Sequence, residues 1–354
     1  MDKRIVGLDV IRVVSALVIC AFHTVIHLGC DYGILQLFLR NGAVLMTTFF
    51  ILSGFALAIS NGETDLSNII GFYKKRAISI LPLYYLCAIA QDVMMTAYTA
   101  FFAGGVQERL EQVLFLAPIE AVGMQSIYVS LFDYNHNGGT WFISCLIICY
   151  LLYPLLICVV KKNTQNQRVI IAGILAAFCV YSSYIAARFN LASLYSNPAI
   201  RFCEFAIGVN IGSIWLEKAR IKTSDKANIM TLLSATVIMA VGVSMSCKIF
   251  RYDDYMMFSW LIIPLSILLI YNAAQIKKWR FHGVIKYLSG LSYSFFLAQL
   301  FSNTICRYII THTQISSNAI KIFLGWLTCV LIAVFLHHII EIPVATLLKK
   351  KFII

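Results

Sequence analysis

The chain has 354 residues, of which 60% are hydrophobic and 12% are charged, and its formal net charge is +12. Soluble domains are typically about half apolar and about a quarter charged, so this composition excludes an ordinary soluble globular domain. The 11 cysteines are odd in number and scattered through apolar runs without a CxxC pair, which argues against a disulfide-framed secreted domain. The composition therefore predicts an all-α, polytopic membrane protein.

Apolar runs of about 20 residues, the length needed to cross a bilayer as a helix, recur along the whole chain. The ten runs lie at residues 5–28, 42–60, 77–103, 140–160, 169–187, 199–216, 228–247, 256–274, 285–310 and 319–340. The longest interruption, 104–139, is too short for a separate domain. We expect about ten transmembrane helices, no sizeable soluble domain, and a single membrane-embedded domain over residues 1–354.

The basic residues are distributed unevenly between the two ends of these runs. With the N-terminus in the cytoplasm, 19 of the 28 lysines and arginines fall in cytoplasmic segments and 8 fall in external segments or their helix edges. Cytoplasmic loops of membrane proteins carry an excess of Lys and Arg, so the asymmetry predicts that both termini are cytoplasmic. Topology also explains most of the net charge, and we therefore expect the lipid bilayer, and no nucleic acid, as a partner.

The first predicted helix carries Asp9, Arg12, His23 and His27. Arg12 and His23 are eleven residues apart, which at about 100° per residue brings both to one face, about 16 Å apart along the axis. Asp9 precedes Arg12 by three residues and can pair with it, and His27 continues the face. A charged side chain at the bilayer centre costs roughly 3 kcal/mol unless it is paired or hydrated, so these residues indicate function.

The residue types on this face indicate a reaction between a cytoplasmic anion and an acceptor on the far side. Arginine binds phosphate or carboxylate, and histidine accepts a proton from a hydroxyl near neutral pH. In the alternative interpretation Arg12 reaches the cytoplasmic headgroups, and His23 only hydrogen-bonds a neighbouring helix. Depth, face and residue type together favour a functional pair.

Further polar residues lie inside the predicted spans. They are Asp92, Arg201, Glu204, Gln299, His337, His338 and Glu341. Arg201 and Glu204 are three apart, so mutual neutralisation is an alternative to a role in substrate binding. We interpret His337 and His338 as helix-interface residues.

An Asn- and Gly-rich segment, 135–139, precedes Trp141 and reads as an external turn. Asn137 with Trp141 at the base of this turn is suited to contact a sugar. An ordinary connector between two helices is the alternative.

Several short stretches follow one another along the chain. They are Gly7-Leu8-Asp9-Val10-Ile11-Arg12 with His23 after ten further residues, Phe49-Phe50-Ile51-Leu52-Ser53-Gly54-Phe55, Phe72-Tyr73-Lys74-Lys75-Arg76, Thr140-Trp141-Phe142, Arg201-Phe202-Cys203-Glu204-Phe205, Leu291-Ser292-Tyr293-Ser294 and Glu341-Ile342-Pro343. In this order the chain resembles the acyltransferase 3 family, which comprises integral-membrane O-acyltransferases of bacterial surface glycans. The resemblance covers essentially the whole chain.

The resemblance implies transfer of an acyl group, usually acetyl, from cytoplasmic acetyl-CoA as co-substrate to a hydroxyl of an extracytoplasmic glycan. It implies that His23 is the general base or acyl relay and that Arg12 is needed for use of the acyl donor. Lys74, Lys75 and Arg76 are implied to bind the CoA phosphates. The implied location is the bacterial inner (plasma) membrane.

The remaining expected site residues fall into two groups, and we expect no metal. Trp141, Asn137, Arg201 and Glu204 are expected to bind the acceptor, and Asp9, His27, Tyr293, Gln299 and Glu341 are expected to support the site. Three features depart from the family pattern, and one of them is the absence of a glutamate after Trp141 of the kind found in a larger branch of the family. Ser79 stands where many relatives carry a second arginine, and Gln299 stands where histidine is common.

A different functional class remains open from the residues themselves. A transporter or flippase for a glycan precursor or an anion would use Arg12 and His23 for binding and proton coupling. Many transporters contain inverted repeats, and the sequence shows no such duplication, which weighs against this class. A membrane scaffold would leave the polar face of the first helix unexplained.

Overall fold

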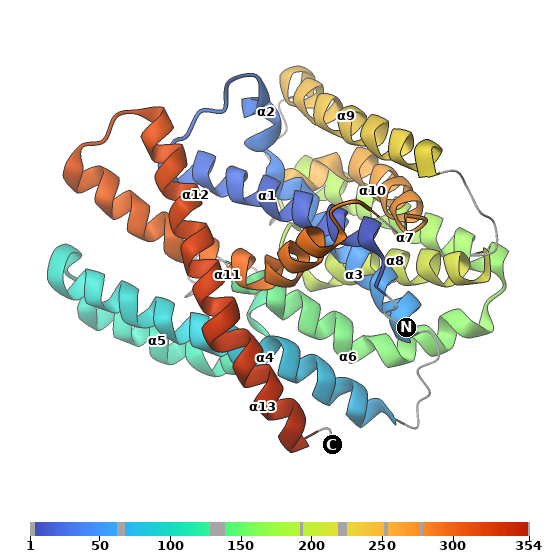
Figure 1. The fold of residues 1–354 in the computed structure, drawn as a ribbon, viewed down its shortest axis with the longest axis horizontal. Helices are drawn as coiled ribbons and strands as arrows, with labels where there is room; N and C mark the ends of the chain where they lie inside the picture. Colours follow the sequence, from blue (N-terminus) through green and yellow to red (C-terminus); the bar gives the residue numbers. More distant parts are fainter. Residues whose placement is uncertain are drawn as a thin grey trace. The chain divides into compact units, whose positions relative to one another are not determined.

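The computed structural model describes residues 4–61, 68–127, 139–191, 194–218, 225–250, 254–276 and 279–352 (Figure 1). Within these residues every regular element is a helix, and there is no strand. Nine helices in the described part of the chain are long and apolar enough to cross a membrane. The predicted all-α polytopic fold is confirmed, and the described residues contain no sizeable soluble domain.

The elements, with 3-10 and π segments written η, follow one another along the chain. Their bounds are α1 Val6–Leu28, η1 Gly33–Leu35, α2 Gln36–Leu39, η2 Gly42–Val44, α3 Leu45–Asn61, α4 Ile69–Tyr98, η4 Thr99–Ala103, α5 Val106–Ala121, η5 Gln125–Ile127, α6 Thr140–Lys162, α7 Gln165–Arg188, α8 Pro198–Lys218, α9 Asp225–Phe250, η7 Tyr255–Phe258, α10 Ser259–Ala273, α11 His282–Thr313, α12 Asn318–Phe335, η8 Leu336–Glu341 and α13 Ile342–Phe352.

Polar caps start some helices earlier than hydropathy alone predicts. α4 begins at Ile69, eight residues before the predicted start at 77, because the Asn68 Oδ1 accepts a hydrogen bond from the Gly71 amide at 3.1 Å. α7 begins at Gln165 behind a capping box between Thr164 and Gln167. Polar first turns lower the hydropathy of a segment without preventing a helix.

The last two predicted spans differ from the other eight. The run 285–310 lies in α11, a 32-residue helix whose polar side chains make it less apolar than the nine candidate spans. The run 319–340 continues beyond its predicted end, because α12 passes through the π-helix η8 into α13 (Figure 1). A π-helix is rare and is frequently found at functional sites.

The described residues divide into two compact units, which we describe separately. Unit 1 contains the described parts of 1–64, 152–195 and 199–292, and unit 2 contains those of 65–151, 196–198 and 293–354. In unit 1, α10 packs against α9, α3 and α1. In unit 2, α4 packs against α5, η8 and α13.

Two glycines let α3 and α8 touch through their backbones in unit 1. A Cβ on Gly54 would lie 2.0 Å from the Phe205 carbonyl oxygen, and a Cβ on Gly208 would lie 2.0 Å from the Ile51 carbonyl oxygen. Small residues at helix crossings allow such close approach in membrane proteins. This contact fixes the register of α8 on α3, and with it the polar residues of both helices.

Replacing Gly208 tests this contact. We expect Gly208→Ala to lower the free energy of unfolding by about 1–3 kcal/mol, because the new methyl group overlaps backbone atoms that can only separate by moving a helix. The measurement is the melting temperature of the detergent-solubilised protein. The matched control is Gly173→Ala in α7, where an added Cβ meets nothing within 4 Å and a small gain is expected. Equal melting temperatures for the two variants would contradict the proposed backbone contact.

Candidate functional site

The carboxylate of Asp9 organises the first turn of α1 in unit 1. It is buried, and it accepts hydrogen bonds from Arg4 Nε at 2.7 Å, Arg12 Nη1 at 3.2 Å and Ser289 Oγ at 2.6 Å. Arg12 Nη1 also donates to Ser289 Oγ at 3.1 Å. The predicted Asp9–Arg12 ion pair is therefore present, and it holds a guanidinium whose side chain remains 31% exposed.

The imidazole of His23 lies about three turns further along the same helix. α1 is continuous from Val6 to Leu28, so the helical rise separates Arg12 and His23 by about 16 Å. The His23 ring stacks on His27 with 5.5 Å between centroids and an interplanar angle of 11°, and its centroid is 5.0 Å from that of Phe22. Aromatic contacts thus fix the ring plane.

One nitrogen of this ring is available for chemistry. His23 Nδ1 is buried and has no hydrogen-bond partner among the described residues. Buried polar atoms are nearly always hydrogen-bonded, so an unpaired one needs an explanation such as a bound substrate group. An imidazole nitrogen without a protein partner suits the exchange of a proton with a hydroxyl.

Arg76 borders a cavity in unit 2. Its guanidinium carbon lies 5.4 Å from the ring centroid of Phe72 and 5.5 Å from that of Tyr150. The cavity measures about 160 Å³ and is lined by Tyr73, Arg76, Ala77, Ile80, Leu81, Ile147, Tyr150 and Leu151. Arg76 Nε is buried without a hydrogen-bond partner among the described residues. The aromatic rings therefore position a guanidinium whose Nε–H can still donate a hydrogen bond.

The neighbouring basic residues of α4 are placed differently. Lys74 and Lys75 lie on the helix with exposed side chains. The Ser79 Oγ donates to the Lys75 carbonyl at 2.8 Å, so this side chain turns back onto its own helix. Of the three predicted donor-binding residues, Arg76 lines the cavity and the two lysines face outward.

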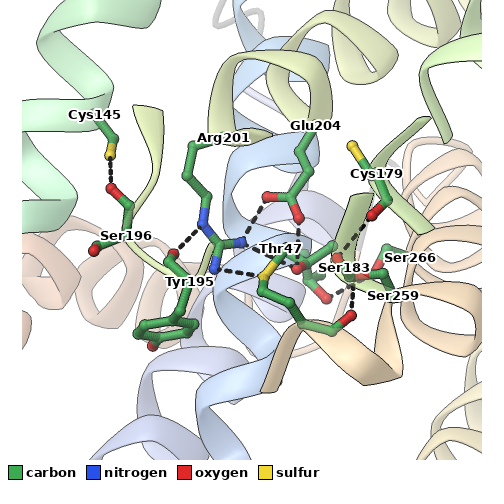
Figure 2. Close-up of polar contacts among 12 residues, drawn as sticks. Thr47, Cys145, Cys179, Ser183, Tyr195, Ser196, Arg201, Glu204, Ser259 and Ser266 are labelled. Atoms are coloured by element: carbon green, nitrogen blue, oxygen red, sulfur yellow. Dashed lines mark hydrogen bonds and ion pairs between the residues drawn. The ribbon is translucent and has the colours of Figure 1, made fainter. Parts of the chain in front are cut away.

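Arg201 and Glu204 form a closed ion pair at the start of α8 (Figure 2). Their side chains are 1% and 0% exposed, with Arg201 Nη1 2.7 Å from Glu204 Oε2. Thr47 of α3 bridges the pair, accepting from Arg201 Nη1 at 3.1 Å and donating to Glu204 Oε1 at 2.8 Å. Arg201 Nε donates to the Tyr195 carbonyl at 2.7 Å. The pairing that the sequence left open is present and holds the α7–α8 connection on α3.

Tyr195 completes the enclosure of this ion pair. Its ring centroid lies 5.0 Å from the Arg201 guanidinium carbon. Burial raises the pKa of the Tyr195 hydroxyl above its ordinary value. The residue therefore stays neutral and acts as an aromatic wall for the arginine.

For three other expected site residues the structure gives little information about a role in binding or catalysis. Trp141 is buried at the first turn of α6 and packs edge-on against Phe142. Gln299 of α11 is buried, and neither of its amide atoms has a partner among the described residues. Asn137 lies outside the described residues. The acceptor-binding roles of Trp141 and Asn137 and the supporting role of Gln299 stay predictions.

The C-terminal polar residues meet in unit 2. Glu341 Oε2 accepts from Ser294 Oγ at 2.6 Å and lies 2.7 Å from His337 Nδ1. The Tyr293 hydroxyl donates to the Ile80 carbonyl at 2.9 Å. Sequence reasoning treated His337 as an interface residue, although its spacing four residues before Glu341 was a usable signal for a pair.

Two hydroxyl residues were missed because their roles depend on contacts between helices. Ser289 bridges Asp9 and Arg12 from α11, and Thr47 bridges Arg201 and Glu204 from α3. No spacing rule along the chain connects either residue with its partners. In the described residues no group of three or more His, Cys, Asp or Glu side chains is arranged to hold a metal ion.

A comparison with protein families gives the chain its class. The family model of acyltransferase 3, described as an acyltransferase domain, matches residues 5–338. The chain belongs to the acyltransferase 3 family. Comparisons with curated proteins and with solved structures found no match. As a member of this family, and with its apolar helices, the protein is a membrane acyltransferase.

The enclosure of Arg201 and Glu204 leads to a stability prediction. We expect Glu204→Gln to lower the free energy of unfolding by about 3–5 kcal/mol, because it leaves a fully buried guanidinium without its counter-charge. Thermal unfolding in detergent measures the loss. The double variant Arg201→Met with Glu204→Leu removes both charges and should lose less than the single variant. A Glu204→Gln protein with wild-type stability and no transfer activity would instead favour a role in binding the acceptor.

Proposed function

We propose that this acyltransferase transfers an acetyl group from cytoplasmic acetyl-CoA to a hydroxyl of an extracytoplasmic polysaccharide or glycoconjugate. The protein is then a membrane-bound O-acyltransferase. The observation that carries the proposal is the polar face of α1, where one continuous helix holds the anchored Arg12 and, about 16 Å away, the unpaired nitrogen of His23. This separation allows Arg12 to contact the anionic part of the donor while the acyl group reaches the acceptor hydroxyl beside His23.

His23 serves the acceptor hydroxyl in this proposal. The reaction breaks the C–S bond of the thioester and forms a C–O bond to the glycan, and the hydroxyl proton passes to His23. A thioester needs little further activation, so removal of the hydroxyl proton and alignment of the two substrates provide most of the rate acceleration. The stacking of His23 on His27 and its tilted contact with Phe22 support this role, because they fix the ring without occupying Nδ1.

The basic residues serve the anionic donor. Arg76 supports this assignment through its buried Nε and its place on a cavity wall, and Lys74 and Lys75 add positive charge on the exposed face of the same helix. Guanidinium groups bind phosphate oxygens through paired hydrogen bonds. At about 160 Å³ the cavity accommodates only a part of CoA. Arg12 adds a second cation, held by Asp9 and Ser289.

Transfer of label from the donor tests the assigned residues. In reconstituted protein with radiolabelled acetyl-CoA and a crude surface-glycan acceptor, we expect label in an ester on the glycan. His23→Ala should reduce transfer at least about 100-fold, because it removes a general base. Arg12→Ala should reduce it comparably by losing a donor contact. Matched controls are His312→Ala and Arg188→Ala, whose side chains are exposed at helix ends and should keep full activity.

The same experiment separates the competing functions. Full transfer by His23→Ala, with the protein inserted in the membrane, would remove the proposed role of this residue. Movement of a glycan precursor across the vesicle without incorporation of label would favour the transporter class.

The unequal distribution of basic residues gives a topology prediction. We propose a multi-pass protein of the bacterial inner membrane with both termini in the cytoplasm, because 19 of the 28 basic residues then lie on the cytoplasmic side. A reporter that is active only in the cytoplasm should be active when fused after residue 354. The same reporter fused to a chain truncated after Leu191, in the connection that follows α7, should be inactive. The reverse pattern would contradict the orientation.

A further inference from the structure

An open apolar groove lies between α7 and α10, which both belong to unit 1 and pack against one another. It measures about 600 Å³, and its walls run from Ala176 to Tyr184 on α7 and from Trp260 to Ile267 on α10. Among the described residues, no charged side chain lines the groove, and no residue proposed to serve the donor or the acceptor does so. Sites for small molecules have volumes of roughly 300–1,000 Å³, so the groove is large enough for a ligand.

Small and irregular residues produce this hollow. Ala176 and Ala177 leave space on α7, and Pro264 interrupts α10 at the facing wall. A proline inside a helix removes a hydrogen bond and perturbs the regular backbone. Neighbouring helices normally fill the space between them, because protein interiors are close-packed. The two helices therefore leave a volume that another molecule has to fill.

The groove continues an apolar outer surface of α7. Ile170, Ile174 and Phe178 of this helix are each at least half exposed. Since the protein is a membrane protein and α7 is one of its candidate spans, hydrocarbon covers these side chains. The groove is thus continuous with the surface that the protein presents to the lipid.

Amphipathic aromatic side chains gather at one end of the groove. Tyr184 lies one turn before the end of α7, and Trp260 is the second residue of α10. These two side chains and that of Tyr181 are 47–65% exposed. Tyr and Trp are enriched where a membrane meets water, because their rings contact hydrocarbon while their polar groups reach the headgroups. This end of the groove therefore has the character of the headgroup level.

The length of the groove matches one leaflet of the bilayer. Ala176 lies eight residues before Tyr184, which is about 12 Å along the axis of α7. Ile267 lies seven residues after Trp260, which is about 10 Å along α10. Half of a hydrocarbon core of about 30 Å is about 15 Å. A chain that enters at the aromatic end would lie in the groove over most of its leaflet.

We infer that this groove binds one acyl chain of a membrane phospholipid, with the headgroup at the end formed by Tyr184 and Trp260. A flexible chain fills an irregular hollow, and it needs no charged partner. Helices that associate in membranes instead use small residues in close contact and hydrogen bonds between the helices. A second copy of the chain would rest on the aromatic rim and leave the hollow empty.

Fluorescence quenching by a brominated phospholipid tests this inference. Bromine quenches tryptophan on contact, so the full-length protein is reconstituted in phosphatidylcholine vesicles with or without bromine on the acyl chains. The chain contains five tryptophans, and the emission of Trp260 is therefore obtained by subtracting that of a Trp260→Phe protein. We expect the brominated lipid to lower the emission of Trp260 at least about two-fold, because a chain in the groove keeps bromine beside the indole.

A variant that fills the groove separates a bound chain from lipid that only passes by. Ala177→Phe places a ring about 10 Å deeper than Trp260 along the helix axis, so it blocks the groove without covering the indole. We expect this variant to lose about half of the quenching of Trp260. The matched control is Val237→Phe, which adds the same ring at an exposed position of α9 and should leave the quenching unchanged.

Native mass spectrometry of the protein released from the same vesicles gives a second measurement. We expect the wild-type monomer to retain phospholipid and Ala177→Phe to retain less. Equal quenching of Trp260 in the wild type and in Ala177→Phe would overturn the inference, because lipid passing over the surface would then explain the signal. An unquenched Trp260 would also overturn it, and a dimeric mass in that case would identify a second copy as the occupant.

Discussion

The structure depends on one constraint: a charged or polar side chain inside an apolar helical protein has to find its partner within the protein, because lipid supplies none. Arg201 and Glu204 meet this constraint, with Thr47 bridging them and no more than 1% of either side chain exposed. Asp9 meets it by gathering Arg4, Arg12 and Ser289. These contacts connect α1, α3, α8 and the start of α11, so electrostatics and packing specify the same arrangement.

The exceptions to the constraint are as informative as the cases that obey it. His23 Nδ1 and Arg76 Nε are buried, and neither has a hydrogen-bond partner among the described residues. A bound hydroxyl beside the imidazole and a bound phosphate beside the guanidinium would satisfy both atoms.

Sequence patterns predicted those features of the protein that depend on residues close together in the chain. Hydropathy located the long apolar helices because the length of a spanning segment is set by bilayer thickness, but it missed α5, which lies within the predicted interruption 104–139. The Arg12–Asp9 and Arg201–Glu204 pairs followed from a spacing of three residues. Hydropathy misplaced the start of α4 by eight residues because the cap at Asn68 and the basic first turns are polar. It also gave no sign of η8, since the π-helical turn reflects packing around His337 and Glu341 rather than composition.

The sequence by itself determined that the protein is all-helical, that it spans a membrane, and which ionisable residues lie inside its helices, because these properties follow from composition and from periodicity within single helices. Only the tertiary structure decided which of those residues are satisfied and which are left with an unpaired atom. Ser289 and Ser294 of α11 and Thr47 of α3 acquire their roles from helices far away in the chain. Hydrogen bonds between helices depend on register and on close approach through residues such as Gly208, and no spacing along the chain encodes these distances.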